Sequence, residues 1–248
     1  MHIPRIGVLC LAIAVSSAAP ALAQTWPERV HVSVNAAFQP TANDFTDRFE
    51  FESNVETGST SSEFAMKAGP AFDVGFGYRF WRNLAAGVSV SFFTKDGVAQ
   101  TTSSFPHPFF FTQPREVTGE ATGIARSERV VHVQLQYLWD PTGPFRAVFA
   151  GGPSFFNVEQ DLVSEVVINE TFPYDTATFT SVQTRRGNGS VVAFNVGADV
   201  IWMLGQKVGV GGLVRFSRTE VNIDAPANRT VRVDAGGVYA GGGLRVLF

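Results

Sequence analysis

Cysteine is almost missing from this sequence, which contains a single one, Cys10, in 248 residues. It lies in a segment that has the features of a secretory signal: Arg5, an apolar run over 6–15 and the small-residue site Ala21-Leu22-Ala23. We therefore expect residues 1–23 to be a signal peptide that is cleaved after Ala23. The mature chain would then contain no disulfide and no cysteine ligand.

Charge and long apolar runs are also scarce. Only 17% of the residues are charged, and 19 basic residues stand against 22 acidic ones without forming basic clusters, which argues against a nucleic-acid partner. Beyond residue 23 no stretch reaches the roughly 18 consecutive apolar residues of a membrane helix. If the mature chain crosses a membrane, it must therefore do so as a closed barrel.

What the sequence has in abundance is alternation of apolar residues with glycine or polar residues. A period of two indicates β-strands. The alternating segments are 30–39, 72–80, 88–92, 131–139, 145–158, 192–202, 208–217 and 230–248. They predict an all-β fold, an eight-stranded antiparallel up-and-down barrel that occupies 24–248 as one domain.

The connections alternate in length. Turns at 81–83, 140–144 and 205–206 are short, whereas 40–62, 99–115 and 164–177 read as long loops, and 225–229 as a modest one. Phe45, Phe49 and Phe51 are placed to extend the first strand. Gly151-Gly152-Pro153 predicts a bulge in the fifth strand. Short turns at one end and long loops at the other are typical of outer-membrane barrels.

Alternation alone also fits a soluble barrel whose apolar faces point inward. Three features favour the opposite orientation, with the apolar faces toward lipid. The polar faces carry small residues and isolated charges, the chain ends on the apolar face, and aromatic residues flank the short turns. These aromatic residues are Phe80, Trp81, Tyr137, Trp139, Phe145 and Trp202.

The last segment, TVRVDAGGVYAGGGLRVLF at 230–248, ends on an aromatic residue. With Gly243, Val246 and Phe248 it resembles the C-terminal assembly signal of bacterial outer-membrane barrels. Over 24–248 the chain resembles the small outer-membrane β-barrel superfamily, of the OmpA-transmembrane-domain, OmpX and OmpW kind. This resemblance implies a bacterial outer-membrane location, insertion by the outer-membrane assembly machinery, and contact with outer-membrane lipids and lipopolysaccharide.

Several charged residues fall on the inward faces of the predicted strands. They could form a permeation path or a packed polar network of salt bridges, and the narrow interior of an eight-stranded barrel favours the network. The residues are Asp73, Arg79, His132, Arg146, Asp199, Arg215 and Arg245. Outside the barrel, Arg185 and Arg186 could meet lipopolysaccharide phosphates or form an ordinary solvated pair.

The FPHPFFF run at 105–111 is the most unusual predicted loop. Adjacent phenylalanines are costly in water, so they either contact a ligand or partner, or the loop folds over the barrel mouth or against lipid. The candidate contact residues are Phe105, His107, Phe109, Phe110 and Phe111.

Catalysis would need a histidine with serine and an acid. The mature chain has only His31, His107 and His132, scattered along the sequence without such an arrangement. We expect no catalytic residues, no metal site and no cofactor. The expected function is a structural or surface-interaction role. The alternatives are a passive, OmpW-like channel or porin for small apolar solutes and, third, a lipid-modifying outer-membrane enzyme; the ligand is unknown.

Overall fold

The structure, a computed structural model, describes residues 28–40, 43–141, 143–226 and 229–248, so the predicted signal peptide 1–23 lies outside the described residues. Within these ranges the chain forms ten strands, and no helix there could span a membrane. The strands are β1 (Val30–Gln39), β2 (Phe45–Ser53), β3 (Glu56–Met66), β4 (Gly69–Trp81), β5 (Leu84–Phe105), β6 (Arg115–Trp139), β7 (Phe145–Glu170), β8 (Ala177–Met203), β9 (Val208–Ala225) and β10 (Arg229–Leu247).

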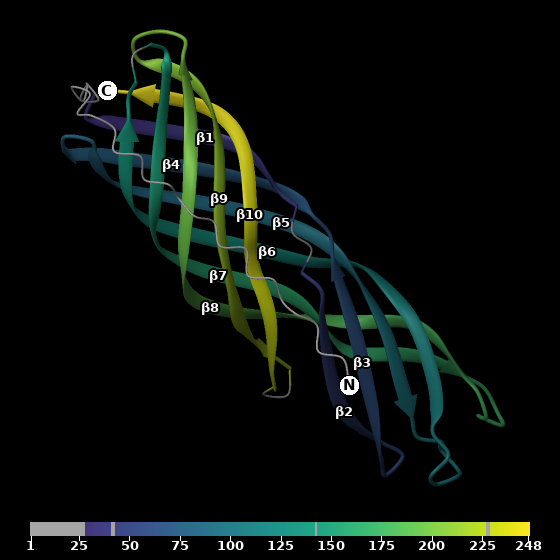
Figure 1. The fold of residues 1–248 in the computed structure, drawn as a ribbon. Coiled ribbons are helices and arrows are strands. Elements are labelled where there is room, and N and C mark those ends of the chain that lie inside the picture. The colour runs from purple at the N-terminus through teal and green to yellow at the C-terminus, as the bar shows by residue number, and fades with distance from the viewer. Residues whose placement is uncertain (1–27, 41–42, 142, 227–228) are drawn as a thin grey trace, which may run out of the picture.

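Eight of these strands close into a barrel (Figure 1). The strands β4 to β10 pair in chain order, and β1 completes the ring between β10 and β4. All neighbours are antiparallel; Val32 of β1, for example, faces Val246 of β10 on one side and Phe76 of β4 on the other. The predicted eight-stranded, antiparallel up-and-down barrel is therefore confirmed for the barrel wall.

The hairpin formed by β2 and β3 adds two strands to the predicted eight. The first predicted strand is interrupted and resumes as β2, which contains Phe45, Phe49 and Phe51 as expected. The predicted loop over 40–62 is wrong, because its TGSTSS run forms part of β3 and pairs with β5. Thr60 and Ser62 hydrogen bond to Ser103 and Thr101 across that ladder, so these polar residues belong to a sheet.

The other two long loops are also shorter than predicted. Residues 99–105 belong to β5 and 164–170 to β7, which leaves only 106–114 and 171–176 as loops.

The predicted bulge at Gly151-Gly152-Pro153 is wrong as well. The β6–β7 ladder lacks two pairs there, but Leu135 with Gly151 keeps the register of His132 with Ser154. An inserted residue does occur on β6, at Gly123, whose φ of 74° suits glycine.

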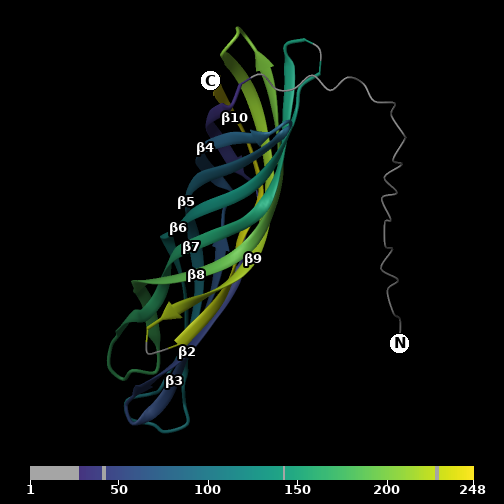
Figure 2. The ribbon, with the colours of Figure 1, turned by 90° about the vertical axis from the view of Figure 1, so that its left-hand side faces the viewer.

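The two ends of the barrel differ strongly (Figure 2). We call the end with the connections 82–83, 140–144 and 204–207 the turn end, and Phe248 lies there. The opposite, loop end carries the connections 54–55, 106–114 and 171–176. At that end the β2–β3, β5–β6 and β7–β8 hairpins project beyond the end of the β9–β10 hairpin.

In the half of the barrel near the turn end, apolar side chains point outward. On β6 they run from Val131 to Trp139, close to the ~9–11 residues that a tilted strand needs to cross a bilayer. We call this surface the apolar belt. Its exposed residues include Val34, Phe38, Phe72, Val74, Phe76, Tyr78, Val88, Phe92, Val131, Val133, Leu135, Phe149, Phe155, Val192, Phe194, Val196, Val200, Val210, Val214, Phe216, Val238 and Leu244.

In the loop half the two faces exchange their chemistry. Outward positions become polar, as in Glu116, Thr118 and Glu120 of β6, whereas Val117 and Ile124 of the same strand are buried inside. The inward residues from several strands form one apolar core. It contains Phe64, Met66, Ala99, Phe105, Val117, Ile124, Val130, Phe156, Val158, Leu162, Val163, Val166, Val221, Ile223, Val231, Val233 and Ala235. The loop half is therefore built like a water-soluble barrel, and the turn half like a barrel in lipid.

Candidate functional site

A single layer of buried side chains crosses the interior of the turn half, and each of the eight wall strands contributes one residue to it. We call it the closing layer. It consists of Asn35, Asp73, Ser91, His132, Ser154, Asn195, Arg215 and Tyr239. Because inward positions recur at every second residue, the antiparallel registers bring these eight side chains to a similar depth.

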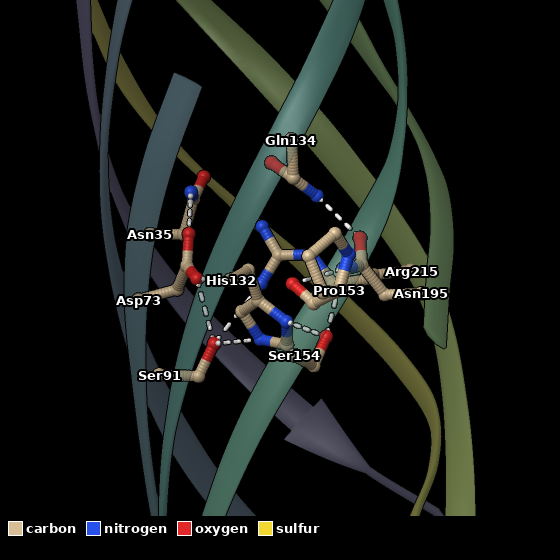
Figure 3. A network of polar contacts seen from close by, with 9 residues as sticks. All are labelled: Asn35, Asp73, Ser91, His132, Gln134, Pro153, Ser154, Asn195 and Arg215. Carbon is tan, nitrogen blue, oxygen red and sulfur yellow. Dashed lines mark hydrogen bonds and ion pairs between the residues drawn. The ribbon is translucent and has the colours of Figure 1, made fainter. Parts of the chain in front are cut away.

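The ion pair between Asp73 and Arg215 is the centre of this layer (Figure 3). Arg215 Nη1 lies 2.8 Å from Asp73 Oδ2, and both side chains are buried. Asn35 donates to the other carboxylate oxygen at 3.1 Å, and Ser91 donates to Oδ2 at 2.8 Å. The guanidinium also lies 5.8 Å from the centre of the Tyr239 ring. A buried carboxylate with this many donors is compensated as a charge.

Hydrogen bonds continue from Ser91 across the interior. His132 Nε2 lies 3.2 Å from Ser91 Oγ, and His132 Nδ1 lies 2.7 Å from Ser154 Oγ. Asn195 donates to Ser154 at 2.7 Å and accepts from Gln134 at 2.6 Å. Since Ser91 gives its proton to Asp73, it accepts from His132, and this assigns the histidine proton to Nε2.

Serine, histidine and aspartate meet in this layer, but not in the order of a catalytic triad. A triad needs a carboxylate on one histidine nitrogen and the nucleophile on the other. Here both nitrogens of His132 meet serines, and Asp73 bonds Ser91 directly. His132 is 2% exposed, which leaves a substrate no access. Among the residues that the structure describes, no group of His, Cys, Asp and Glu could hold a metal ion.

The remaining predicted lumen charges lie closer to the turn end. Arg245 binds Asp199 through two hydrogen bonds of 2.7 Å each. Arg146 reaches Glu28 at 3.0 Å and Asp140 at 3.2 Å. Burial raises the pKa of the Asp140 carboxyl in its turn; Arg146 opposes the shift and Glu28 adds to it.

The seventh predicted lumen residue, Arg79, lies at the rim and not in the interior. Its guanidinium donates to the backbone oxygens of Glu28 and Arg82 at 3.0 and 3.2 Å. All seven predicted residues therefore lie on the turn half, where Asp73 pairs with Arg215, Asp199 with Arg245, and Arg146 with two carboxylates.

Two small cavities lie on either side of the closing layer. One, of about 30 Å³, borders His31, Gln134 and Arg215, and another, of about 20 Å³, borders His132, Arg215 and Tyr239. A water molecule needs ~10–15 Å³, so each cavity has room for one or two. Arg215 stands between them, and its ion pair separates the two spaces.

A second buried charged group lies just beyond the belt and was missed by sequence reasoning. Arg126 Nε binds Glu128 Oε1 at 2.9 Å, and Lys95 lies against the Phe93 ring with its ammonium 4.9 Å from the ring centre. Every second residue of β6 points inward, so counting back from His132 through Val130 would have placed Glu128 and Arg126 inside. Val130, a residue of the apolar core, lies between this group and His132 on β6, so these charges are buried among apolar residues.

At the loop end the predicted contact residues divide into two groups. Phe105 and His107 are buried, whereas Phe109, Phe110 and Phe111 are exposed. The exposed rings do not reach the apolar belt, since their loop lies at the far end of β5 and β6.

The predicted assembly signal forms the last residues of the barrel wall. Gly243 faces Asn35 on β1 so closely that a Cβ atom would come within 1.8 Å of the Val34 oxygen, so only glycine fits. Phe248 is 60% exposed, and its backbone exchanges hydrogen bonds with Val30. The terminal residue thus closes the barrel while its ring remains available outside.

No protein-family model and no curated protein matches the sequence. Among solved structures the chain is similar to the Neisserial surface protein A (13% identity, 88% of this chain and 97% of that one, TM-score 0.46). It is also similar to the outer membrane protein OprG from Pseudomonas aeruginosa (13%, 89% and 97%, TM-score 0.45). A third is Ail, the attachment invasion locus protein of Yersinia pestis, solved with a heparin analogue (10%, 88% and 99%, TM-score 0.37). Likeness of this size says nothing about shared function.

Proposed function

We propose that this chain is an integral protein of the bacterial outer membrane with a structural or surface-interaction role. The observation that carries this proposal is the exchange of faces along each long strand. Apolar side chains point outward over a band that matches a bilayer, and inward beyond it. In water, apolar side chains would point inward along the whole length of each strand, so the apolar belt requires lipid.

The aromatic residues of the turn end support this orientation. Trp81, Trp139 and Trp202 are exposed beside the three short turns, as expected for a girdle at the membrane interface. The turn end would face the periplasm, where the assembly machinery would meet the terminal strand with Gly243, Val246 and Phe248. The loop end would face the outside of the cell.

Basic side chains just beyond the belt suit contact with lipopolysaccharide. Arg129 and Arg218 lie two residues beyond the belt residues Val131 and Phe216 and are exposed. Arg186, on the neighbouring strand β8, pairs with Asp161 at 3.0 Å and is still exposed. Exposed guanidinium groups beyond the belt would bind lipid phosphates through charge-assisted hydrogen bonds.

A passive channel for small apolar solutes is the second candidate. A cavity of about 360 Å³ at the loop end, lined in part by Phe49, Phe51, Phe105 and Val166, favours it. The closing layer opposes it, because an apolar solute that entered there would meet a buried ion pair. A role as a lipid-modifying enzyme is opposed by the wrong order of Ser91, His132 and Asp73.

Electrophoretic mobility of the protein from the outer-membrane fraction tests the proposal. Samples in detergent are compared before and after boiling. A closed membrane barrel stays folded without boiling and migrates differently from the boiled chain. Recovery of the chain as soluble periplasmic protein, with no shift on boiling, would overturn the proposal.

A further inference from the structure

The three connections at the loop end are joined into one surface, which we call the tip and define as residues 50–59, 103–117 and 165–179. Asn54 donates to the backbone oxygen of Pro106 at 3.3 Å, and Glu56 accepts from the Thr112 amide at 2.9 Å. Arg115 donates to the backbone oxygens of Pro106 and Tyr174, each at 3.0 Å, and pairs with Glu170. These contacts make the three connections a single platform.

His107 fixes the loop that carries the phenylalanines. Its Nδ1 accepts hydrogen bonds from the backbone amides of Phe109 and Phe110, both at 3.1 Å. The imidazole is buried, and its Nε2 lies 3.6 Å from Asp175 in the next loop. The loop is thus held by a buried side chain while its three phenylalanine rings remain more than half exposed.

The tip exposes several large apolar side chains. Phe109, Phe110, Phe111 and Phe172 are 62%, 53%, 70% and 80% exposed, and Val55 is 97% exposed. Val55 also has a φ of 65°, a conformation that costs a β-branched residue ~1–3 kcal/mol. A strained and exposed valine beside fixed, exposed phenylalanines is typical of a contact surface.

The charge of the tip indicates which kind of partner would bind there. The tip contains seven carboxylates, namely Glu50, Glu52, Glu56, Glu116, Glu165, Glu170 and Asp175, and one arginine, Arg115, which is buried. Such a surface repels anionic lipid headgroups, polyanions and a second copy of itself. Exposed aromatic rings beside carboxylates attract ammonium and guanidinium groups, both through the ring faces and through the acids.

We propose that the tip binds a cationic amphipathic segment of another polypeptide. The apolar side chains of that segment would cover Phe109, Phe110, Phe111 and Phe172, and its lysines or arginines would face the carboxylates around them. The inference deepens the proposed surface-interaction role and rests on it, because the partner must reach the loop end from outside the cell.

The test uses the full chain in nanodiscs of zwitterionic lipid, with empty nanodiscs as reference. The probe is a short, dye-labelled amphipathic peptide of leucine and lysine, and the matched peptide carries glutamate in place of lysine. Fluorescence anisotropy gives the affinity of each. We expect the lysine peptide to bind and the glutamate peptide not to bind, with an affinity that falls as salt rises.

Two sets of charge variants localise the effect. Glu52→Gln, Glu116→Gln and Glu165→Gln together should weaken binding by about tenfold or more. Glu63→Gln, Asp96→Asn and Asp224→Asn remove the same charge from exposed positions outside the tip and should change affinity by less than about twofold. Phe109→Ser with Phe111→Ser should abolish binding without changing the mobility shift on boiling, which shows that the barrel is folded.

Three results would overturn the inference: equal binding of the glutamate peptide, equal losses from both charge sets, or tip-dependent binding of zwitterionic vesicles as tight as that of the lysine peptide. Binding is measured on purified protein, whereas the location is read from cell fractions. If the chain lies in the outer membrane but does not bind the lysine peptide, the proposed partner is refuted and the proposed function is unaffected.

Discussion

Val133 and Thr118 lie on the same strand, β6, and both point away from the interior, yet they face different surroundings. Val133→Arg places a charge in the apolar belt and should cost ~2–4 kcal/mol if the residue lies near the bilayer midplane. Thr118→Arg places the same charge beside Glu116 and Glu120, where water solvates it, and should be nearly neutral. Urea unfolding of both variants in lipid vesicles measures the difference, and equal costs would refute the exchange of faces.

The ion pair of Asp73 and Arg215 should behave as a coupled unit. Arg215→Met leaves a buried carboxylate without its cation and should destabilise the barrel by ~3–5 kcal/mol. Asp73→Asn combined with Arg215→Met removes both charges and should cost clearly less than the sum of the single changes. Unfolding free energies of the four proteins of the cycle give the coupling, and additive costs would mean that the pair is not a unit.

At this scale the sequence predicts which residues point inward but not which of them meet. Asp73, His132 and Arg215 were recognised because alternation fixes the face of each residue in a strand. The contact of Arg215 with Asp73 spans 142 positions of the chain and crosses the interior between strands that are not neighbours. Such a contact depends on the stagger of the closed barrel, which alternation does not contain.

The hairpin of β2 and β3 is attached to the barrel on one side only. β3 pairs with β5, but no ladder joins β2 to β10 among the described residues. Arg229 bridges this seam: it binds Asp47 at 2.6 Å and the Arg48 backbone oxygen at 3.1 Å, and its guanidinium lies 4.8 Å from the centre of the Phe49 ring. One arginine therefore holds a free sheet edge in place.

Arg229→Met should loosen this hairpin without unfolding the barrel. We expect the amides of β2 to exchange with deuterium about tenfold faster, the equivalent of ~1.4 kcal/mol. Arg232→Met is the matched control, since Arg232 is exposed on the same strand and pairs with Glu220 only at 3.4 Å. If β2 exchanges at the same rate in both variants, Arg229 does not hold the seam.

Element boundaries near the belt were predictable, and those beyond it were not. The turns at 81–83, 140–144 and 205–206 were found because apolar alternation stops there. The long strands were cut short, at 99–105 and 164–170, because polar outward residues such as Thr102 and Ser104 look like loop residues. In the proposed orientation water surrounds that half of the sheet, so a strand there needs no apolar outer face.

The whole barrel should not conduct ions. The closing layer spans the interior, and the cavities on its two sides hold about 30 and 20 Å³. Planar-bilayer recordings of the purified protein should show no stepwise current. Asp73→Ser with Arg215→Ser removes the central pair while keeping the charge balanced, and this variant should also stay closed, because the apolar core still fills the loop half. Steady currents through the unchanged protein would favour the passive channel as its function.

Insertion of such a barrel requires its long hairpins to cross the hydrocarbon layer with their charged outer faces. Some of the exposed charges of the loop half are matched inside a hairpin. Arg186 pairs with Asp161 between β7 and β8, and Arg218 pairs with Asp234 between β9 and β10. A hairpin that crosses with such pairs formed carries less uncompensated charge through lipid than two separate strands would. Surface ion pairs that contribute little to the stability of the folded barrel can thus lower the energy barrier to its insertion into the membrane.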